Sequence, residues 1–232
     1  MKLTFKHAGA VLGMVFAFNA IAAPILPTFG TFGPLAGATF SGTGIPNNPV
    51  AITTVGGLTL GMAASQRFVG PNLGNNGAGT YKAPAGVSLA SPSPADPYAL
   101  WNFNFYVNGA NSTMAFRLFY DFDAAVGNDE STHGTISFPG SAITSPGGLA
   151  QNSWNLGMDF LATSSVPQGR VAPPGVFDPY APGQYTFALV AYNASTLQEI
   201  GRSAIAVNVP EPGTVALAGL ALLGLAVARR RT

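Results

Sequence analysis

Apolar and polar residues alternate along much of the chain between residues 50 and 209. In the clearest segment, 101–108, Trp, Phe, Phe and Val alternate with Asn, Asn, Tyr and Asn. Successive side chains of a strand point to opposite faces, so this period of two predicts strands with one buried face. The same period recurs in segments 114–123, 154–160, 185–191 and 205–209. No amphipathic helical stretch of useful length interrupts it.

Clusters of Gly, Pro and Asn separate these segments and predict turns. Short strands joined by such turns are typical of an all-β fold. We therefore expect an antiparallel β-sandwich, immunoglobulin-like or jelly-roll-like, over residues 50–209. Residues 23–49 are rich in Gly, Pro and Thr and are predicted to form an extended lead-in with one edge strand.

The segment Ala181-Pro182-Gly183-Gln184-Tyr185 opens one of the predicted strands. It is similar to the Pro-Gly-x-Tyr start of a late strand in immunoglobulin-like sandwiches. The resemblance implies that the hydroxyl of Tyr185 hydrogen-bonds to nearby backbone. Residues 202–209 continue the alternation and are expected to form the hairpin partner of this strand.

The first 22 residues have the organisation of a secretory signal peptide. A positively charged start is followed by an apolar stretch over residues 8–18. Ala20 and Ala22 then supply the small residues of an A-x-A site for signal peptidase. The sequence therefore predicts export, with a mature chain that begins at Ala23.

The chain ends in three parts with different physical properties. The prolines of Pro210-Glu211-Pro212 remove backbone donors and stop regular structure from continuing. An uncharged apolar run over residues 214–228 follows and is predicted to form a short transmembrane helix. At 1.5 Å per residue it spans only ~22 Å of a ~30 Å hydrocarbon core. Arg229-Arg230-Arg231 comes last and is expected to stay on the cytoplasmic side.

A span this short suits a tail that is inserted transiently and then processed; an ordinary single-span anchor is the alternative. The three-part tail, residues 210–232, resembles the PEP-CTERM sorting signal of exported bacterial proteins. The resemblance implies recognition by a membrane enzyme, an exosortase, that cuts near the Pro-Glu-Pro motif. It further implies a passage through the inner membrane to the cell surface or medium, and an association with biofilm and exopolysaccharide. It says nothing about what the folded part does.

Charged residues are scarce, at 8% of the chain. Residues 23–209 hold five basic and eight acidic residues, a net charge of −3, so we exclude nucleic-acid binding. Asn, Ser, Thr, Gln and Gly must supply most of the polar surface, which suits hydrogen bonding to sugars and equally a passive matrix protein. Cysteine is absent, so the exported domain has no disulfides and depends on its core.

Four carboxylates lie close together in the sequence: Asp121, Asp123, Asp129 and Glu130. The first two are two apart on a predicted strand and therefore share a face, and the others follow in a loop. Oxygen ligands grouped in this way suit Ca²⁺, although the spacing is not that of an EF-hand. The alternative, which the sequence favours, is a solvated acidic turn partly balanced by Arg117. No other cofactor is expected.

Catalytic residues are few, and we expect the protein not to be an enzyme. His133 is the only histidine after the predicted signal peptide, and no Gly-x-Ser-x-Gly elbow accompanies it. Glycoside hydrolysis requires two carboxylates on either side of a cleft. Carboxylates that neighbour one another on one strand do not meet this requirement.

Two functions stay open on these observations. The first is a non-enzymatic surface or matrix protein that an exosortase sorts through its tail. The alternative is a carbohydrate-binding sandwich, with or without calcium at the acidic cluster. Trp101 and Trp154 are expected in the core, because they are in register with other large apolar residues. Tyr106, beside Asn102 and Asn104 on the polar face of its strand, is the better candidate for sugar contact.

Overall fold

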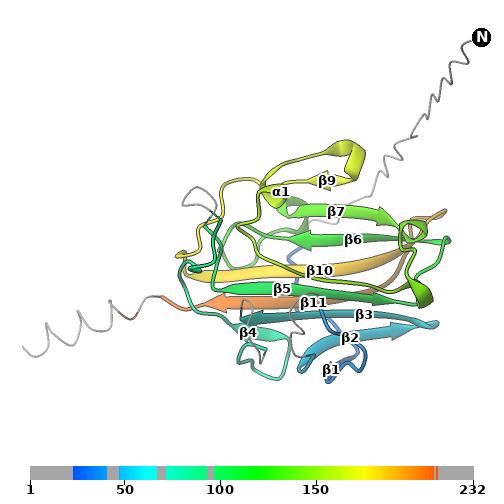
Figure 1. Ribbon diagram of the computed structural model, residues 1–232, viewed down its shortest axis with the longest axis horizontal. Helices are drawn as coiled ribbons and strands as arrows, with labels where there is room; N and C mark the ends of the chain where they lie inside the picture. Colours follow the sequence, from blue (N-terminus) through cyan, green and yellow to red (C-terminus); the bar gives the residue numbers. More distant parts are fainter. Residues whose placement is uncertain (1–22, 41–46, 67–71, 93–96, 212, 214–232) are drawn as a thin grey trace, which may run out of the picture.

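The computed structural model describes residues 23–40, 47–66, 72–92, 97–211 and 213, and its strands form two sheets that run along the long axis of the molecule (Figure 1). Side chains from both sheets pack into one apolar cluster between them. The predicted β-sandwich is therefore confirmed, whereas its assignment as immunoglobulin-like or jelly-roll-like stays a prediction.

The first sheet has five strands in the order β1-β2-β3-β5-β8, and every neighbouring pair is antiparallel. Gly56 and Gly57 join β2 to β3 and both have positive φ, which the type I′ two-residue hairpin turn requires. The strands are β1 (Thr31–Gly33), β2 (Val50–Val55), β3 (Leu58–Gln66), β5 (Trp101–Asn108) and β8 (Ala150–Trp154).

The second sheet has six strands in the order β4-β11-β10-β6-β7-β9, and only the pair of β4 with β11 is parallel. Its two longest strands, β10 and β11, form the hairpin that the sequence predicts. The strands are β4 (Thr80–Lys82), β6 (Met114–Tyr120), β7 (Gly134–Pro139), β9 (Arg170–Val171), β10 (Gly183–Asn193) and β11 (Glu199–Val209).

Helical structure is limited, in the described residues, to single turns in the connections. They are α1 (Asp159–Ala162) and the 3₁₀ turns η1 (Glu130–Thr132), η2 (Gly140–Ala142), η3 (Pro146–Gly148) and η4 (Val166–Gln168).

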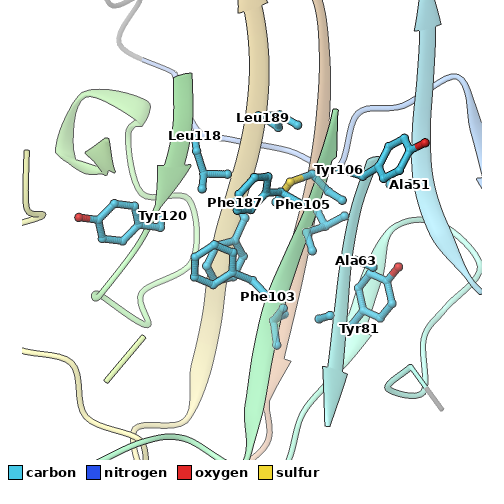
Figure 2. Packing of buried hydrophobic residues seen from close by; sticks show 14 of the residues in the cluster. Ala51, Ala63, Tyr81, Phe103, Phe105, Tyr106, Leu118, Tyr120, Phe187 and Leu189 are labelled. Carbon is cyan, nitrogen blue, oxygen red and sulfur yellow. The ribbon is translucent and has the colours of Figure 1, made fainter. Parts of the chain in front are cut away.

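Aromatic side chains fill the space between the sheets, and Figure 2 shows part of this cluster. Phe103 of β5 stacks on Phe187 of β10, with ring centroids 4.7 Å apart and an interplanar angle of 20°. Trp101 packs against Tyr185 of the same opposing strand at 5.7 Å. Trp154 is half-buried and contacts the edge of Phe105 at 4.8 Å. Both tryptophans therefore belong to the core, as the sequence predicts.

The strand predicted over residues 154–160 is wrong beyond its first residue, because β8 ends at Trp154 and a helical turn begins at Asp159. The buried amide of Asn155 turns the chain: its Oδ1 accepts from the backbone nitrogens of Ala99 and Gly157. At Gly157 a β-carbon would lie 2.4 Å from the Pro97 carbonyl, so only glycine fits this close approach. The local alternation could not reveal this contact with a distant loop.

Residues 23–40 pack along both sheets. Ile25 is buried against the outer face of the six-stranded sheet, beside Phe119 and Ala204. The chain then pairs with Ala204 through Thr28 and supplies β1 at the edge of the other sheet. The described residues of the predicted lead-in, 23–49, therefore cover apolar surface of the sandwich itself.

Candidate functional site

The last strand of the fold, β11, ends directly before the C-terminal tail. Val209, the last residue of β11, is 3% exposed and pairs with Gly183 at the start of β10. Its neighbour Asn208 pairs with Lys82 of β4 on the other side of the strand. Pro210 and Glu211 follow directly and are exposed. The strand that leads to the motif is thus held from both sides, and the motif begins where its pairing stops.

The other residues predicted to act in export and sorting lie outside the described part of the chain. They are Ala20, Ala22, Pro212, Arg229, Arg230 and Arg231, together with the predicted signal peptide and apolar tail helix. Within the described residues, no helix combines the length and apolar character needed to cross a bilayer.

The acidic cluster is divided among structural roles. Asp121 is buried at the end of β6, where its carboxylate accepts hydrogen bonds from the backbone of Asp123 and from Asn128, both at 2.9 Å. Asp123 is exposed, and its own carboxylate accepts from the backbone of Ala125. Burial raises the pKa of Asp121 above its ordinary 3.8, while the hydrogen bond from Asn128 and the charge of His133 act in the opposite direction.

The two following carboxylates have other partners. Asp129 caps the turn η1 by accepting from the backbone of Ser131, and this hydrogen bond lowers the pKa of Asp129. Glu130 lies 2.6 Å from Arg202 of β11, which also contacts Glu199 at 2.9 Å. Glu130 therefore forms its ion pair with Arg202 of β11, while Arg117 also interacts electrostatically with Glu130.

The carboxylates predicted to hold calcium have separate partners in the described part of the chain. Among the described residues, no three His, Cys, Asp or Glu side chains come close enough together to hold a metal ion. Asp121 is enclosed by donors from its own turn, and Glu130 is engaged by Arg202. These carboxylates are close in the sequence, but their side chains contact different partners and do not converge on one position.

His133 is buried directly before β7, and its ring reaches Thr186 of β10. Its Nδ1 lies 2.9 Å from the carbonyl of Asp129, which can only accept, so Nδ1 carries a proton. Its Nε2 lies 2.7 Å from the hydroxyl of Thr186 and 3.5 Å from the carboxylate of Asp121. In a catalytic triad the hydroxyl and the carboxylate contact different ring nitrogens, and here they face the same one. The arrangement links β10 to the acidic turn and does not have the geometry of a catalytic triad.

The polar face of β5 is covered over Asn102, Asn104 and Tyr106. Tyr106 is 4% exposed, and its hydroxyl lies within 3.7 Å of the β-carbon position of Gly37. Gln151 of β8 holds the covering segment in place, because its side-chain oxygen accepts from the backbone nitrogens of Thr39 and Phe40. The candidate role of Tyr106 in sugar contact is therefore wrong, since residues 34–40 occupy the face on which a sugar would stack.

The asparagines of the same face form an internal amide network. Asn104 bonds to Ser65 of β3 at 3.0 Å, and Asn102 bonds to Ser153 of β8 at 2.9 Å. Asn155 donates to Asn102 at 2.8 Å. Buried polar groups require such partners, so these side chains serve strand packing.

A shallow groove lies beside the edge strand β8, under the connection from β7. It encloses about 420 Å³. Phe105, Ile143 and Leu149 provide apolar surface, while Thr144 and Ser145 provide exposed hydroxyl groups. The rest of the lining is Ala142, Ala150, Gln151 and Asn152, so the described lining carries no charge. Sequence reasoning missed this groove, because its sides come from a connection without periodicity.

Residues 208–231 match the PEP-CTERM protein-sorting motif. The resemblance seen in the three-part tail is thereby confirmed. The chain accordingly carries the sorting domain of an exosortase substrate, which implies an exported protein with an exosortase as its processing partner. No curated protein matches the chain. The match begins inside β11, so the sorting domain and the sandwich share residues 208 and 209.

The raised pKa of Asp121 predicts the sign of a pH effect. Because the pKa of Asp121 is higher in the folded state than in the unfolded state, protonation of this carboxyl stabilises the fold. The contribution is fully present below pH 3.8 and is lost as pH rises through the folded-state pKa. Wild type should therefore gain unfolding free energy relative to Asp121→Asn as pH falls from 7 to 4, measured by urea denaturation. Asp178→Asn, at an exposed carboxylate that also accepts from backbone, is the matched control. A relative loss by wild type would instead mean that the His133 charge dominates.

Proposed function

We propose that this protein is a non-enzymatic surface or matrix protein, exported through its signal peptide and delivered to an exosortase by its tail. One observation carries the proposal: the sorting motif is continuous with β11, and its first residues are exposed directly after a buried strand end. The folded domain is thus complete before the motif begins. An enzyme that cuts near the motif removes no described core residue.

The mechanism that we assign to the tail is positional. Signal peptidase removes residues 1–22, and the apolar run 214–228 holds the chain in the inner membrane while Arg229-Arg230-Arg231 keeps the end cytoplasmic. Pro210-Glu211-Pro212 then lies just outside the bilayer, where its prolines prevent it from extending the strand. The exosortase recognises this strip, and the sandwich passes to the cell surface or medium.

The polar groups of the fold support a non-catalytic role. Asp121, the most buried carboxylate among the described residues, and the buried His133 are engaged in contacts that join the acidic turn to the sheet. The low charge of the domain suits a protein that resides among neutral polysaccharide, and we propose exopolysaccharide or biofilm matrix as its surroundings.

The tail assignment predicts the behaviour of one variant. In the native host, Pro210→Ala with Glu211→Ala should leave the protein in the membrane fraction, with release to the surface or medium reduced about tenfold or more, equivalent to ~1.4 kcal/mol in the recognition step. Immunoblots of separated fractions measure this. Ser195→Ala with Gln198→Ala, both at exposed positions of the β10–β11 turn, is the matched control and should be released normally. Normal release of the tail variant would refute the role of the motif.

A second function is supported by the groove beside β8. Its volume of about 420 Å³ falls in the range of small-ligand sites. Hydroxyl groups beside uncharged apolar surface suit a neutral saccharide, whose ring has apolar faces and a polar rim. We propose that the groove binds a short stretch of neutral polysaccharide, which would retain the released sandwich in the matrix.

Calorimetry with the host's exopolysaccharide measures binding to the groove and tests this second function. Thr144→Ala with Ser145→Ala should weaken binding about tenfold or more, because each lost hydrogen bond contributes ~1 kcal/mol. Ala142→Trp should fill the groove and abolish binding. Ser195→Ala, an exposed hydroxyl on the β10–β11 turn, is the control. Binding that survives Ala142→Trp would place the saccharide elsewhere, and silence of the wild type would remove this function.

A further inference from the structure

Three connections gather at the end of the sandwich from which the tail leaves. Gly183 pairs with Val209, and the next residue, Gln184, donates to the carbonyl of Ala124 at 2.8 Å. Ala83 donates to Asn208 at 2.9 Å. Connections 83–92, 121–128 and 173–182 therefore surround the end of β11, and Figure 1 shows loops gathered where its arrow ends. We call this region the tail end of the sandwich.

The tail end presents large apolar side chains to solvent. Leu89, Val126, Val176 and Tyr180 are exposed by 106%, 79%, 89% and 58% respectively. They account for four of the seven large hydrophobic residues that are exposed in the described part of the chain. Each connection of the tail end contributes at least one of them, so exposed apolar residues lie on all three connections around the exit of the tail.

Buried anchors hold these connections in place. Phe177 lies in the core, 6.0 Å from Phe122 and 5.7 Å from Tyr185. The hydroxyl of Tyr185 donates to the carbonyls of Asp178 and Ala181 at 3.2 and 3.4 Å, as the Pro-Gly-x-Tyr resemblance predicts. The exposed side chains beside these anchors therefore project from an ordered framework.

Two more contacts complete the framework. Gly86 donates to the carbonyl of Pro179 at 2.8 Å and ties the first connection to the third. Asn128 donates to the carbonyl of Asp123 at 2.9 Å and closes the turn that carries Val126. All three connections are thus held by hydrogen bonds or buried aromatics.

The length of the tail limits how far this end can stand from a bilayer. Four residues, 210–213, separate Val209 from the apolar run that begins at Thr214. A fully extended chain covers at most about 17 Å over this interval. While the apolar run lies in a membrane, the tail end is therefore the part of the sandwich nearest the lipid.

We propose that the tail end is a lipid-contact surface, with Leu89, Val126, Val176 and Tyr180 in the interfacial region of the membrane until the tail is cut. The proposal rests on the membrane stage of the proposed function. Exposed apolar side chains at an interface exchange water for acyl chain and headgroup. The contact fixes the orientation of the sandwich and holds Pro210 and Glu211 at the membrane surface, where a membrane enzyme can reach them.

The charges of the tail end indicate which lipids suit this contact. Asp123, Asp178 and Glu211 are exposed here, and Lys82 is the cation in the described part of the region. Net negative charge disfavours an anionic lipid surface. The contact is therefore apolar in origin, insensitive to salt and strongest on neutral lipids.

The absence of cysteine in the native chain allows site-specific labels. Single variants Leu89→Cys and Val176→Cys report the tail end, and each position is fully or almost fully exposed, so the fold is retained. Ser195→Cys is the matched control. It lies on the β10–β11 turn at the opposite end of the sandwich, about 34 Å from the tail end along the strands. Ala221→Cys reports the tail itself.

The mature chain with its tail intact is reconstituted in phosphatidylcholine vesicles that contain nitroxide-labelled lipid. Quenching of an environment-sensitive fluorophore at positions 89 and 176 should exceed quenching at 195 about threefold or more, since interfacial side chains enter ~5–10 Å into the headgroup and acyl boundary. The difference should persist in 0.5 M salt, well above physiological ionic strength.

Each other outcome has a definite meaning. Equal quenching at 176 and 195, with Ala221→Cys quenched, overturns the lipid contact and leaves the membrane stage intact. No quenching at position 221 overturns the membrane stage and the contact with it. Loss of the difference in high salt would show a contact made by charge. Protection at 89 and 176 only after exosortase is added would assign the tail end to a protein partner.

Discussion

Phe103 and Phe187 join the two sheets, with their rings stacked 4.7 Å apart at the centre of the sandwich. No disulfide can reinforce this contact, because the chain has no cysteine. Ion pairs are few among the described residues, and the ones around Arg202 lie at the surface side of β11. The fold depends on burial of aromatic area between β5 and β10, since aromatic side chains bury large areas in a core. Phe187 in turn pairs with Ile205 of β11, so the same contact fixes the strand from which the tail leaves.

This arrangement suits a domain whose tail is removed. β11 is bordered by β10 and β4, and its last buried residue, Val209, precedes the motif directly. The sandwich needs nothing from the tail to complete its described core, and the tail needs only exposure and a short distance to the membrane. The sandwich and the sorting domain therefore overlap at residues 208 and 209 without competing for the same contacts.

Local pattern was sufficient for some parts of this molecule and insufficient for others. Alternation located β5 and the β10–β11 hairpin, because each strand has one face in the core, and the Pro-Gly-x-Tyr resemblance located the bond made by the Tyr185 hydroxyl. Alternation did not predict the surroundings of Tyr106, which residues 34–40 cover from a distant part of the sequence. For the carboxylates near Asp121, spacing alone does not show where each side chain finds its donor. The cover over Tyr106 and the ion pair of Glu130 with Arg202 are contacts between distant segments, whereas Asp121 finds its donors within its own turn.

The central claim is that the tail is a sorting signal and is cut, and the intact mass of the protein recovered from its host tests it most directly. Cells and medium are analysed separately. The account predicts a species that begins at Ala23 and ends near Pro210-Glu211-Pro212, found at the surface or in the medium. A membrane-bound species that keeps Arg229-Arg230-Arg231 and Thr232 as its only form would make the tail an ordinary anchor and contradict the account.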